Sequence, residues 1–332
     1  RRRNLSANTW RQWLRWLAPV AILVVVLVVL RDQMPFFGEA WRAVRGASIG
    51  PLLLSVATAV LSLAAMSGVM QILLNLEGRI TGVARTNAIV FASNAWSTTV
   101  PGGPALSAWL TFRVHRSWGA SVGLCGWFFV VSGALSTVWM VLIGVVAVAL
   151  LGAELSMWSL VGTLAAALAT IGAVFWATLN PAVLKRWVQF LPEKVRGRVV
   201  DVIDQVSAIR ISAPAFFAAS GLSLTNRLLD LATMVFAVWA VAGQGAPLAG
   251  VCLAFIMTKL AGSAQVTPGG LGTVEPVAVG MLVAAGLPLA HATAATVVYR
   301  AVSFVLITAI GWVVYAAVYA GQTPLRTASA AQ

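Results

Sequence analysis

The sequence predicts an all-α polytopic membrane protein, with about six full transmembrane helices and two re-entrant helical hairpins arranged as an inverted repeat. Of its 332 residues, 60% are hydrophobic and only 9% are charged. A soluble domain cannot enclose that much apolar surface, because its outer shell must face water. Two Pro-Gly-Gly segments interrupt otherwise apolar stretches, and the hydrophobic segments around them recur with the same spacing.

The distribution of basic residues argues against a nucleic-acid-binding protein. The formal net charge is +13, which is also common among proteins that bind nucleic acids. Here, however, the Lys and Arg residues lie between hydrophobic segments and form no stripe on a polar domain. Cytoplasmic loops that face anionic lipid have the same excess, so no nucleic-acid partner is expected.

Six segments have the roughly 20 mostly apolar residues that a transmembrane helix needs. They are 13–30, 49–76, 118–151, 156–179, 212–242 and 290–320. The first is predicted to be retained, because Arg31-Asp32-Gln33 follows it without the small residues of a signal-peptide cleavage site. The segment 118–151 is longer than a straight crossing needs, so we expect it to tilt, to break near Gly133 or to begin along the membrane surface.

Two shorter helices are expected at the membrane surface. Residues 36–48 predict a short interfacial helix with Trp41 at headgroup level. Residues 180–211 form the one sizeable loop, in which an amphipathic helix is predicted. Placing both termini in the cytoplasm puts most Lys and Arg residues on that side, as the positive-inside rule requires for a plasma or inner membrane.

The two remaining apolar stretches, 88–112 and 250–287, contain the Pro-Gly-Gly breaks. The break residues are Pro101, Gly102 and Gly103 in the first stretch, and Pro268, Gly269 and Gly270 in the second. Proline and glycine interrupt helices. Non-helical backbone at membrane depth occurs where it is buried in protein or lines a cavity. Both stretches are therefore predicted to be re-entrant hairpins beside a cavity.

A single shift of 167 residues relates the two halves of the chain, since Pro268 follows Pro101 by that number. The same shift places 49–76 on 212–242, and 118–151 on 290–320, to within a few residues. Three crossings separate the starts of the two copies, so the second copy is inverted, as in many transporters. The chain is thus one membrane domain, divided into an N-terminal and interfacial helix (13–48), repeat A (49–151), a connecting helix and loop (152–211), repeat B (212–320) and a tail (321–332).

Five ionisable residues lie within the apolar segments of repeat B. They are Arg227, Asp230, Lys259, Glu275 and Arg300. Each costs at least about 2.5–3.5 kcal/mol in the bilayer core, so each needs a partner or a function. Arg227 and Asp230 share a helix face, either as a structural salt bridge or as a gated pair that releases Arg227 to an anionic headgroup.

The other three charged residues also have alternative roles. The Lys259 side chain either extends to the membrane surface or faces the cavity. Glu275 either complements the N-terminus of the helix that starts there, or pairs with Lys259 or Arg300 and carries a proton. Arg300, beside Tyr299, lies too deep in the last helix to reach the surface and needs an internal partner. It is the strongest single functional candidate.

Neutral polar residues flank both breaks. They are Asn94, Ser97, Thr98 and Thr99 near the first, and Ser263, Gln265, Thr267 and Thr273 near the second. One interpretation is that they satisfy the interrupted backbone. The other is that they bind substrate beside the N-terminus of each second hairpin arm, where unpaired N–H groups favour phosphate or carboxylate.

Three motifs resemble those of a known family. They are TPGGLGTVE at 267–275, VPGGPALSAW at 100–109 with Arg113, and Tyr299-Arg300. Over about 49–320 the sequence resembles the transmembrane region of the lysylphosphatidylglycerol synthase/flippase family. The resemblance implies two re-entrant elements and movement of a modified phospholipid between leaflets. Relatives are linked to other lipid or polyprenyl-phosphate carriers.

The sequence departs from this family in two ways. Only about a dozen residues follow the last predicted helix, so the aminoacyl-transferase domain of the synthases, and lipid lysylation with it, are not expected. The first hairpin loop reads Pro104-Ala105-Leu106-Ser107 and lacks the acidic residue usual in the family. A cationic lysyl headgroup would need that acid, whereas a net-positive cavity favours an anionic or sugar-phosphate headgroup.

The predicted function is therefore translocation of a lipid or lipid-linked anionic headgroup, including a polyprenyl-phosphate-linked one. The alternative is a secondary transporter of a small anion, coupled to protons through Glu275 or Asp230. A cavity that opens sideways to lipid favours the first, and a closed vestibule favours the second. An enzyme is not expected, because only two acidic residues lie within the membrane segments and the outside loops add only Asp32, Glu39 and Glu154. No cofactor or metal is implied, and a separate lipid-modifying enzyme remains an open alternative as a partner.

Overall fold

The computed structural model describes residues 45–100, 102–151, 157–190, 192–243, 246–263 and 267–320. These residues form helices and turns and include no strand. The predicted first helix at 13–30, residues 36–44 of the predicted interfacial helix, and the tail at 321–332 lie outside the described residues.

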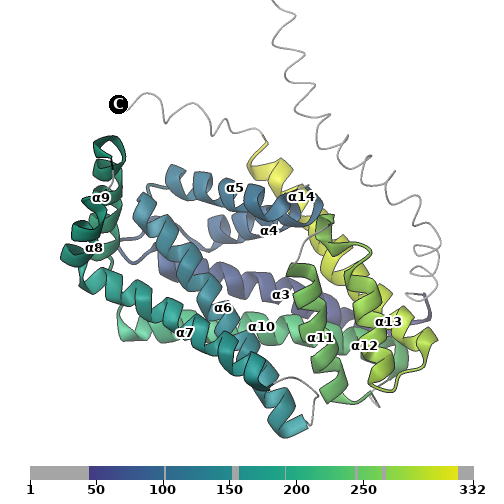
Figure 1. The fold of residues 1–332 in the computed structure, drawn as a ribbon. Helices are drawn as coiled ribbons and strands as arrows, with labels where there is room; N and C mark the ends of the chain where they lie inside the picture. The colour runs from purple at the N-terminus through teal and green to yellow at the C-terminus, as the bar shows by residue number, and fades with distance from the viewer. Residues whose placement is uncertain are drawn as a thin grey trace, which may run out of the picture.

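The helices follow one another with short connections (Figure 1). They are α3 (Ile49–Leu74), α4 (Val83–Thr99), α5 (Gly103–Ser117), α6 (Val122–Leu151), α7 (Met157–Leu179), α8 (Pro181–Val188), α9 (Glu193–Ala208), α10 (Ala213–Ala242), α11 (Leu248–Ser263), α12 (Val274–Ala284), α13 (Leu289–Arg300) and α14 (Ile307–Val318). Among the described residues, α3, α6, α7, α10 and the continuous α13–α14 unit are long and apolar enough to cross a membrane. The prediction of an all-α polytopic membrane protein is confirmed.

The helix bounds follow the predicted repeat. Adding 167 to the bounds of α6 yields 289–318, the bounds of the α13–α14 unit. The same shift places α3 on α10, α4 on α11 and α5 on α12, with every bound within four residues. Each copy therefore consists of a long helix, a helical hairpin and a second long helix.

The first helices of the two copies, α3 and α10, pack closely against each other (Figure 1). Small polar residues join them at intervals of seven residues. The hydrogen bonds run from Ser48 N–H to the Ala240 carbonyl (2.8 Å), from the Ser55 hydroxyl to the Thr233 carbonyl (2.9 Å), and from the Ser62 hydroxyl to the Asn226 carbonyl (3.1 Å). The residue numbers of these partners rise along α3 and fall along α10, so the two helices are antiparallel. This is the orientation that an inverted repeat requires.

Each hairpin also packs against the other copy. Helix α4 contacts α14, and α11 contacts α6, so each hairpin lies beside the last helix of the opposite copy. Glycine permits the tightest of these contacts, because a Cβ on Gly311 of α14 would lie 2.4 Å from the Phe91 carbonyl oxygen of α4. Small residues at such crossings let helix backbones approach closely in membrane proteins.

The first glycine of each break has the same backbone conformation. Gly102 has φ 69° and ψ 21°, and its counterpart Gly269 has φ 61° and ψ 14°, both in the left-handed region that favours glycine. Beyond the first break, α5 begins at once with Gly103, whereas α12 begins at Val274 after a short 3-10 turn. The second arm of the first hairpin therefore starts within the break, and that of the second hairpin starts four residues beyond Gly270.

Two long helices differ in detail from the prediction. Helix α6 starts at Val122 and continues unbroken through Gly133, so the predicted alternatives of a break or a start at 118 along the surface do not apply. Its 30 residues span about 45 Å at 1.5 Å per residue, which exceeds the hydrocarbon thickness and requires tilt. The last helix contains a π-helical segment, Ala301–Leu306, directly after Arg300, which the sequence pattern did not indicate.

We expect Gly103→Ala to destabilise the first hairpin by about 1–3 kcal/mol, the usual cost of overpacking. The added Cβ would lie 2.2 Å from the Ser97 carbonyl oxygen, where the two arms meet. The thermal unfolding midpoint in detergent measures the effect. Gly126→Ala is the matched control, because a Cβ there has no atom within 4 Å, and it should leave the midpoint unchanged or slightly raised. Equal midpoints for the two variants would contradict this account.

Candidate functional site

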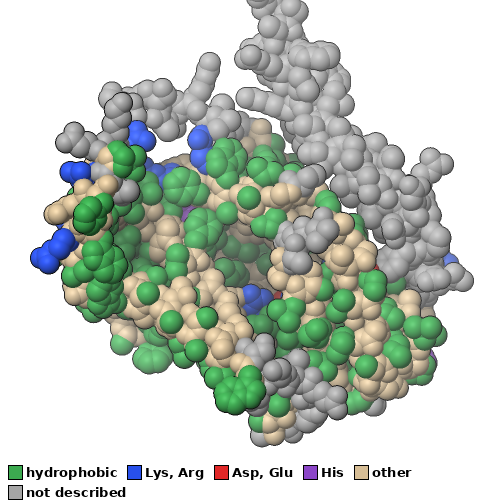
Figure 2. All heavy atoms as spheres, viewed as in Figure 1, with side chains coloured by type: hydrophobic (Ala, Val, Ile, Leu, Met, Phe, Trp, Pro, Cys, Tyr) green, Lys and Arg blue, Asp and Glu red, His purple; other side chains and the backbone are tan. Residues whose placement is uncertain are grey.

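A cavity of about 630 Å³ lies where the two copies meet. Its walls come from α3, α4, α6, α10, α11 and the α13–α14 unit, with the second break at one side. Figure 2 shows the molecule hollowed on the face between α5 and α11, with basic side-chain atoms visible on the floor of the hollow. Nine of the predicted site residues line this cavity: Asn94, Thr98, Arg227, Asp230, Lys259, Ser263, Gly269, Tyr299 and Arg300.

Other predicted residues lie beside the cavity and do not line it. The hydroxyls of Thr267 and Thr273 donate to the carbonyls of Leu271 and Gly270, at 2.7 and 2.9 Å. Those contacts fit the interpretation that residues at a break satisfy the interrupted backbone. The same holds for Thr99, whose hydroxyl donates to a carbonyl of its own helix and accepts from Trp312. The cavity lining also excludes Ser97, Gly102, Gly103, Pro268 and Gly270. Pro101 and Gln265 lie outside the described residues.

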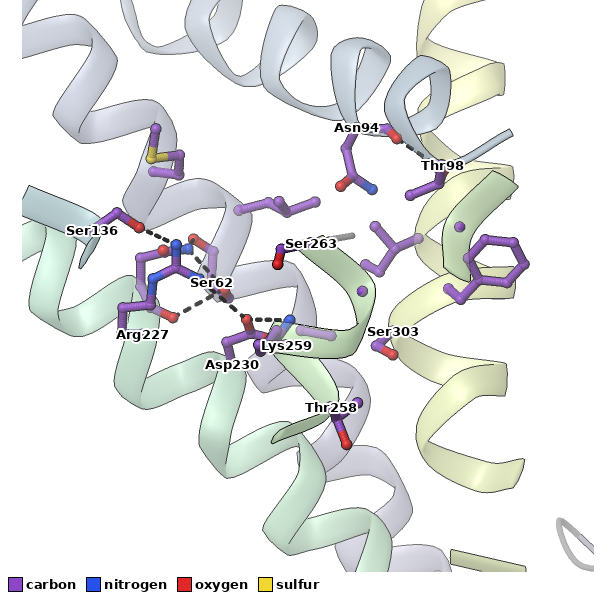
Figure 3. A pocket seen from close by; sticks show the side chains of 18 of the residues that line it. Ser62, Asn94, Thr98, Ser136, Arg227, Asp230, Thr258, Lys259, Ser263 and Ser303 are labelled. Atoms are coloured by element: carbon purple, nitrogen blue, oxygen red, sulfur yellow. Dashed lines mark hydrogen bonds and ion pairs between the residues drawn. The ribbon is translucent and has the colours of Figure 1, made fainter. Parts of the chain in front are cut away.

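Asp230 binds two cations at the cavity wall (Figure 3). Its carboxylate oxygen lies 2.6 Å from Lys259 Nζ and 3.8 Å from Arg227 Nη1. The predicted Arg227–Asp230 pair is therefore present, but the closer partner of Asp230 is Lys259. Lys259 lines the cavity and pairs with Asp230 there, so the alternative in which it extends to the membrane surface does not apply in this structure.

Arg227 has side-chain nitrogens that Asp230 does not bind. Its Nη2 donates to the Ser136 hydroxyl on α6, while its Nε has no hydrogen-bond partner among the described residues although it is buried. Lys259 also lies 5.4 Å from the centre of the Phe255 ring. Two cations thus share one carboxylate, and one positive charge of this cluster has no counter-ion within the cluster.

Arg300 joins the last helix to the second break. Its Nε lies 2.8 Å from Glu275 Oε1, and its Nη2 donates to the Gly269 carbonyl at 2.8 Å. The Phe304 ring, one turn further along the helix, lies 4.5 Å from the guanidinium carbon. Arg300 has the internal partners that its depth in the helix requires.

Glu275 both caps the start of α12 and pairs with Arg300, two of the contacts that were considered for it. While Oε1 pairs with Arg300, Oε2 accepts the Gly272 N–H at 2.7 Å just before α12 begins. A carboxylate at a helix N-terminus is favoured by the backbone dipole. The protein's own carboxylate therefore occupies the start of α12, and the expectation of a substrate anion at that position is not supported.

The comparison with protein families identifies a match to the chain. Residues 16–311 match the family described as Lysylphosphatidylglycerol synthase TM region. The chain belongs to this family. Membership places it among membrane proteins of lipid metabolism or transport. No match to the chain is found among the curated proteins.

Several residues of the site in this family member were missed by the sequence reasoning. Ser136 is one, although the repeat offered a signal: a shift of 167 relates Ser136 to Ser303, and both line the cavity. Ser62 and Asn226 also line it, and they bind each other through the Asn226 amide, which donates to the Ser62 carbonyl at 2.8 Å. No pattern in the sequence indicated Phe304 beneath Arg300.

We expect Asp230→Asn to destabilise the protein by roughly 3 kcal/mol, because two neighbouring cations then lose their counter-ion inside the protein. The added change Lys259→Met should restore part of the loss, since it removes one of the two cations. The thermal unfolding midpoint in detergent is the measurement for both variants.

The exposed pair Lys185–Asp204 provides the control, because exposed salt bridges contribute only about 0–1 kcal/mol. Asp204→Asn should therefore change the midpoint little. If the losses of Asp230→Asn and Lys259→Met simply added in the double variant, the two residues would not be coupled as described.

Proposed function

We propose that this protein is a translocase that moves a lipid with an anionic headgroup between membrane leaflets, without covalent chemistry. The headgroup enters the cavity from the side and binds Arg227 and Lys259, while the acyl chains stay in the surrounding lipid. The observation that carries the proposal is the cluster in which one carboxylate serves two cations inside a cavity that opens sideways.

The direction of the opening supports a lipid as substrate. In Figure 1 the long helices α3 and α10 run across the view, and in Figure 2 the same view looks into the hollow. The hollow therefore opens across the helix axes, toward the side where acyl chains lie when these helices span a bilayer. A vestibule for a soluble ion would instead open along the helix axes toward water.

The charge balance of the cavity supports an anion. Arg227, Lys259 and Arg300 line it together with one carboxylate, Asp230, and Glu275 pairs with Arg300 from behind. After these pairings a single positive charge remains, which a phosphodiester with one negative charge would neutralise. A guanidinium and a phosphate form charge-assisted hydrogen bonds, which are stronger than neutral ones.

The inverted repeat supports alternating access as the mechanism. In such folds one copy rocks against the other around a central site, so that the site faces the two sides in turn. Here the antiparallel contact of α3 with α10 lies at the centre of the repeat, beside the cavity. The two breaks let each hairpin follow the opposite copy, against which it packs.

The small-anion alternative has less support. A proton-coupled transporter would use Asp230 or Glu275 as the proton carrier, and both carboxylates are ion-paired in this structure. A soluble substrate also would not need the sideways opening, because it would enter from the water.

We expect Arg227→Gln and Lys259→Gln to slow the exchange of a labelled anionic lipid between leaflets by about tenfold or more. Each removes a charged hydrogen-bond donor, and a hydrogen bond to a charged group contributes roughly 1.5–3 kcal/mol. The measurement is leaflet exchange of fluorescent phosphatidylglycerol in proteoliposomes. Arg198→Gln, on the exposed side of α9, is the control and should exchange at the wild-type rate.

The proposal is overturned if the folded wild-type protein exchanges no lipid in this assay, or if both cavity variants exchange at the wild-type rate. Uptake of inorganic phosphate into the same liposomes, without lipid exchange, would point to the small-anion transporter.

A further inference from the structure

We propose that Asn94 recognises the part of the headgroup beyond the phosphate, and that this part is uncharged and hydroxylated, such as a glycerol or a sugar. This inference rests on the proposed function, because it assigns a substrate class to the same cavity. It makes the substrate a phosphodiester lipid whose headgroup contains no ammonium group.

Asn94 presents an unused amide to the cavity. It lies on α4, the first arm of the first hairpin, and Figure 3 shows its side chain pointing toward the interior of the pocket. The amide forms no hydrogen bond to any described residue. In contrast, the amide of Asn226 in the same cavity donates to both the carbonyl and the hydroxyl of Ser62. An asparagine amide has two donors and an acceptor, which suit a hydroxyl of a ligand.

Neighbouring hydroxyls on the cavity wall are less available. Ser263 and Ser303 donate to the carbonyls of Leu260 and Tyr299 at 2.7 Å. Thr98, one turn after Asn94, is bonded to its own helix and to Thr308. Of the two described residues of the first hairpin that line the cavity, Asn94 and Thr98, Asn94 is therefore the one whose side-chain hydrogen-bonding capacity is free for a ligand.

The distribution of charge in the cavity determines which headgroup can bind beside Asn94. Among the described lining residues, every charged one belongs to repeat B, and repeat A contributes only neutral side chains. The one carboxylate in the lining, Asp230, is already shared by two cations. An ammonium group on a headgroup would meet no free carboxylate and would be repelled by Arg227 and Lys259, which selects against it. A hydroxyl group would meet Asn94 without that cost.

The size of the cavity fits a headgroup of this kind. Its volume of about 630 Å³ is within the range of pockets that enclose a small ligand. A phosphate bound at Arg227 and Lys259 leaves the remaining space toward α4, where Asn94 lies. The cavity thus has a charged half for the phosphate and a neutral half for the hydroxylated group.

The test compares the exchange of two labelled lipids, phosphatidylglycerol and phosphatidylethanolamine, in separate phosphatidylcholine proteoliposomes. The wild-type protein is expected to exchange phosphatidylglycerol faster. Asn94→Asp should shift the ratio of the two rates toward phosphatidylethanolamine by about tenfold, the size of effect expected from one charge-assisted hydrogen bond. Asn94→Leu, of similar size, should slow phosphatidylglycerol without accelerating phosphatidylethanolamine.

Asn87→Asp is the matched control. Asn87 lies two turns earlier on the same helix, does not line the cavity, and donates to the Val83 carbonyl at 2.9 Å. The same charge change there should leave the ratio of rates unchanged. Gel filtration and the thermal midpoint establish that each variant is folded before its rates are compared.

The outcomes separate this inference from the proposed function. If the wild-type protein exchanges phosphatidylglycerol but Asn94→Asp leaves the ratio at the wild-type value, or slows both lipids equally, the role of Asn94 is wrong while the translocase stands. If Asn87→Asp shifts the ratio as much as Asn94→Asp, general electrostatics explain the effect and the role of Asn94 is again wrong. If the wild-type protein exchanges neither lipid, the proposed function fails first.

Discussion

Charges within an apolar protein must be neutralised by one another, and Asp230 meets this requirement for two cations at once. Removing either partner from an enclosed ion pair is costly, because the remaining charge cannot be solvated. Asp230 therefore holds Lys259 of the second hairpin against Arg227 of α10, and Arg227 in turn reaches Ser136 on α6. The cluster joins three helices from both copies, so the shape of the cavity and its charge depend on the same contacts.

The architecture followed from the sequence because its signals are periodic and local. Hydropathy located the long helices, and the 167-residue shift between the two breaks related one copy to the other. The Arg227–Asp230 pair was also predictable, since residues three apart share a helix face. Both breaks proved to have a left-handed glycine at the same position, Gly102 and Gly269.

The site itself was only partly predictable, because its contacts join residues distant in sequence. The sequence left two partners open for Glu275, Lys259 and Arg300, and only the packing of α13 against α12 shows that Arg300 lies beside it. The closer contact of Asp230 with Lys259 likewise depends on how α11 packs against α10. The π-helical segment after Arg300 and the start of α12 at Val274 were also absent from the sequence prediction, and π-helical segments are frequent at functional sites.

The confinement of the charged lining residues to repeat B has an evolutionary consequence. Duplicated halves usually diverge, and here the two copies have come to contribute different properties to one chamber. Under the proposed function, substitutions among the neutral residues of α4 and α6 would alter which headgroup is preferred while the ionic cluster stays intact. A change of cargo would then require changes in the first half alone, because the charged residues proposed to bind phosphate all lie in the second half.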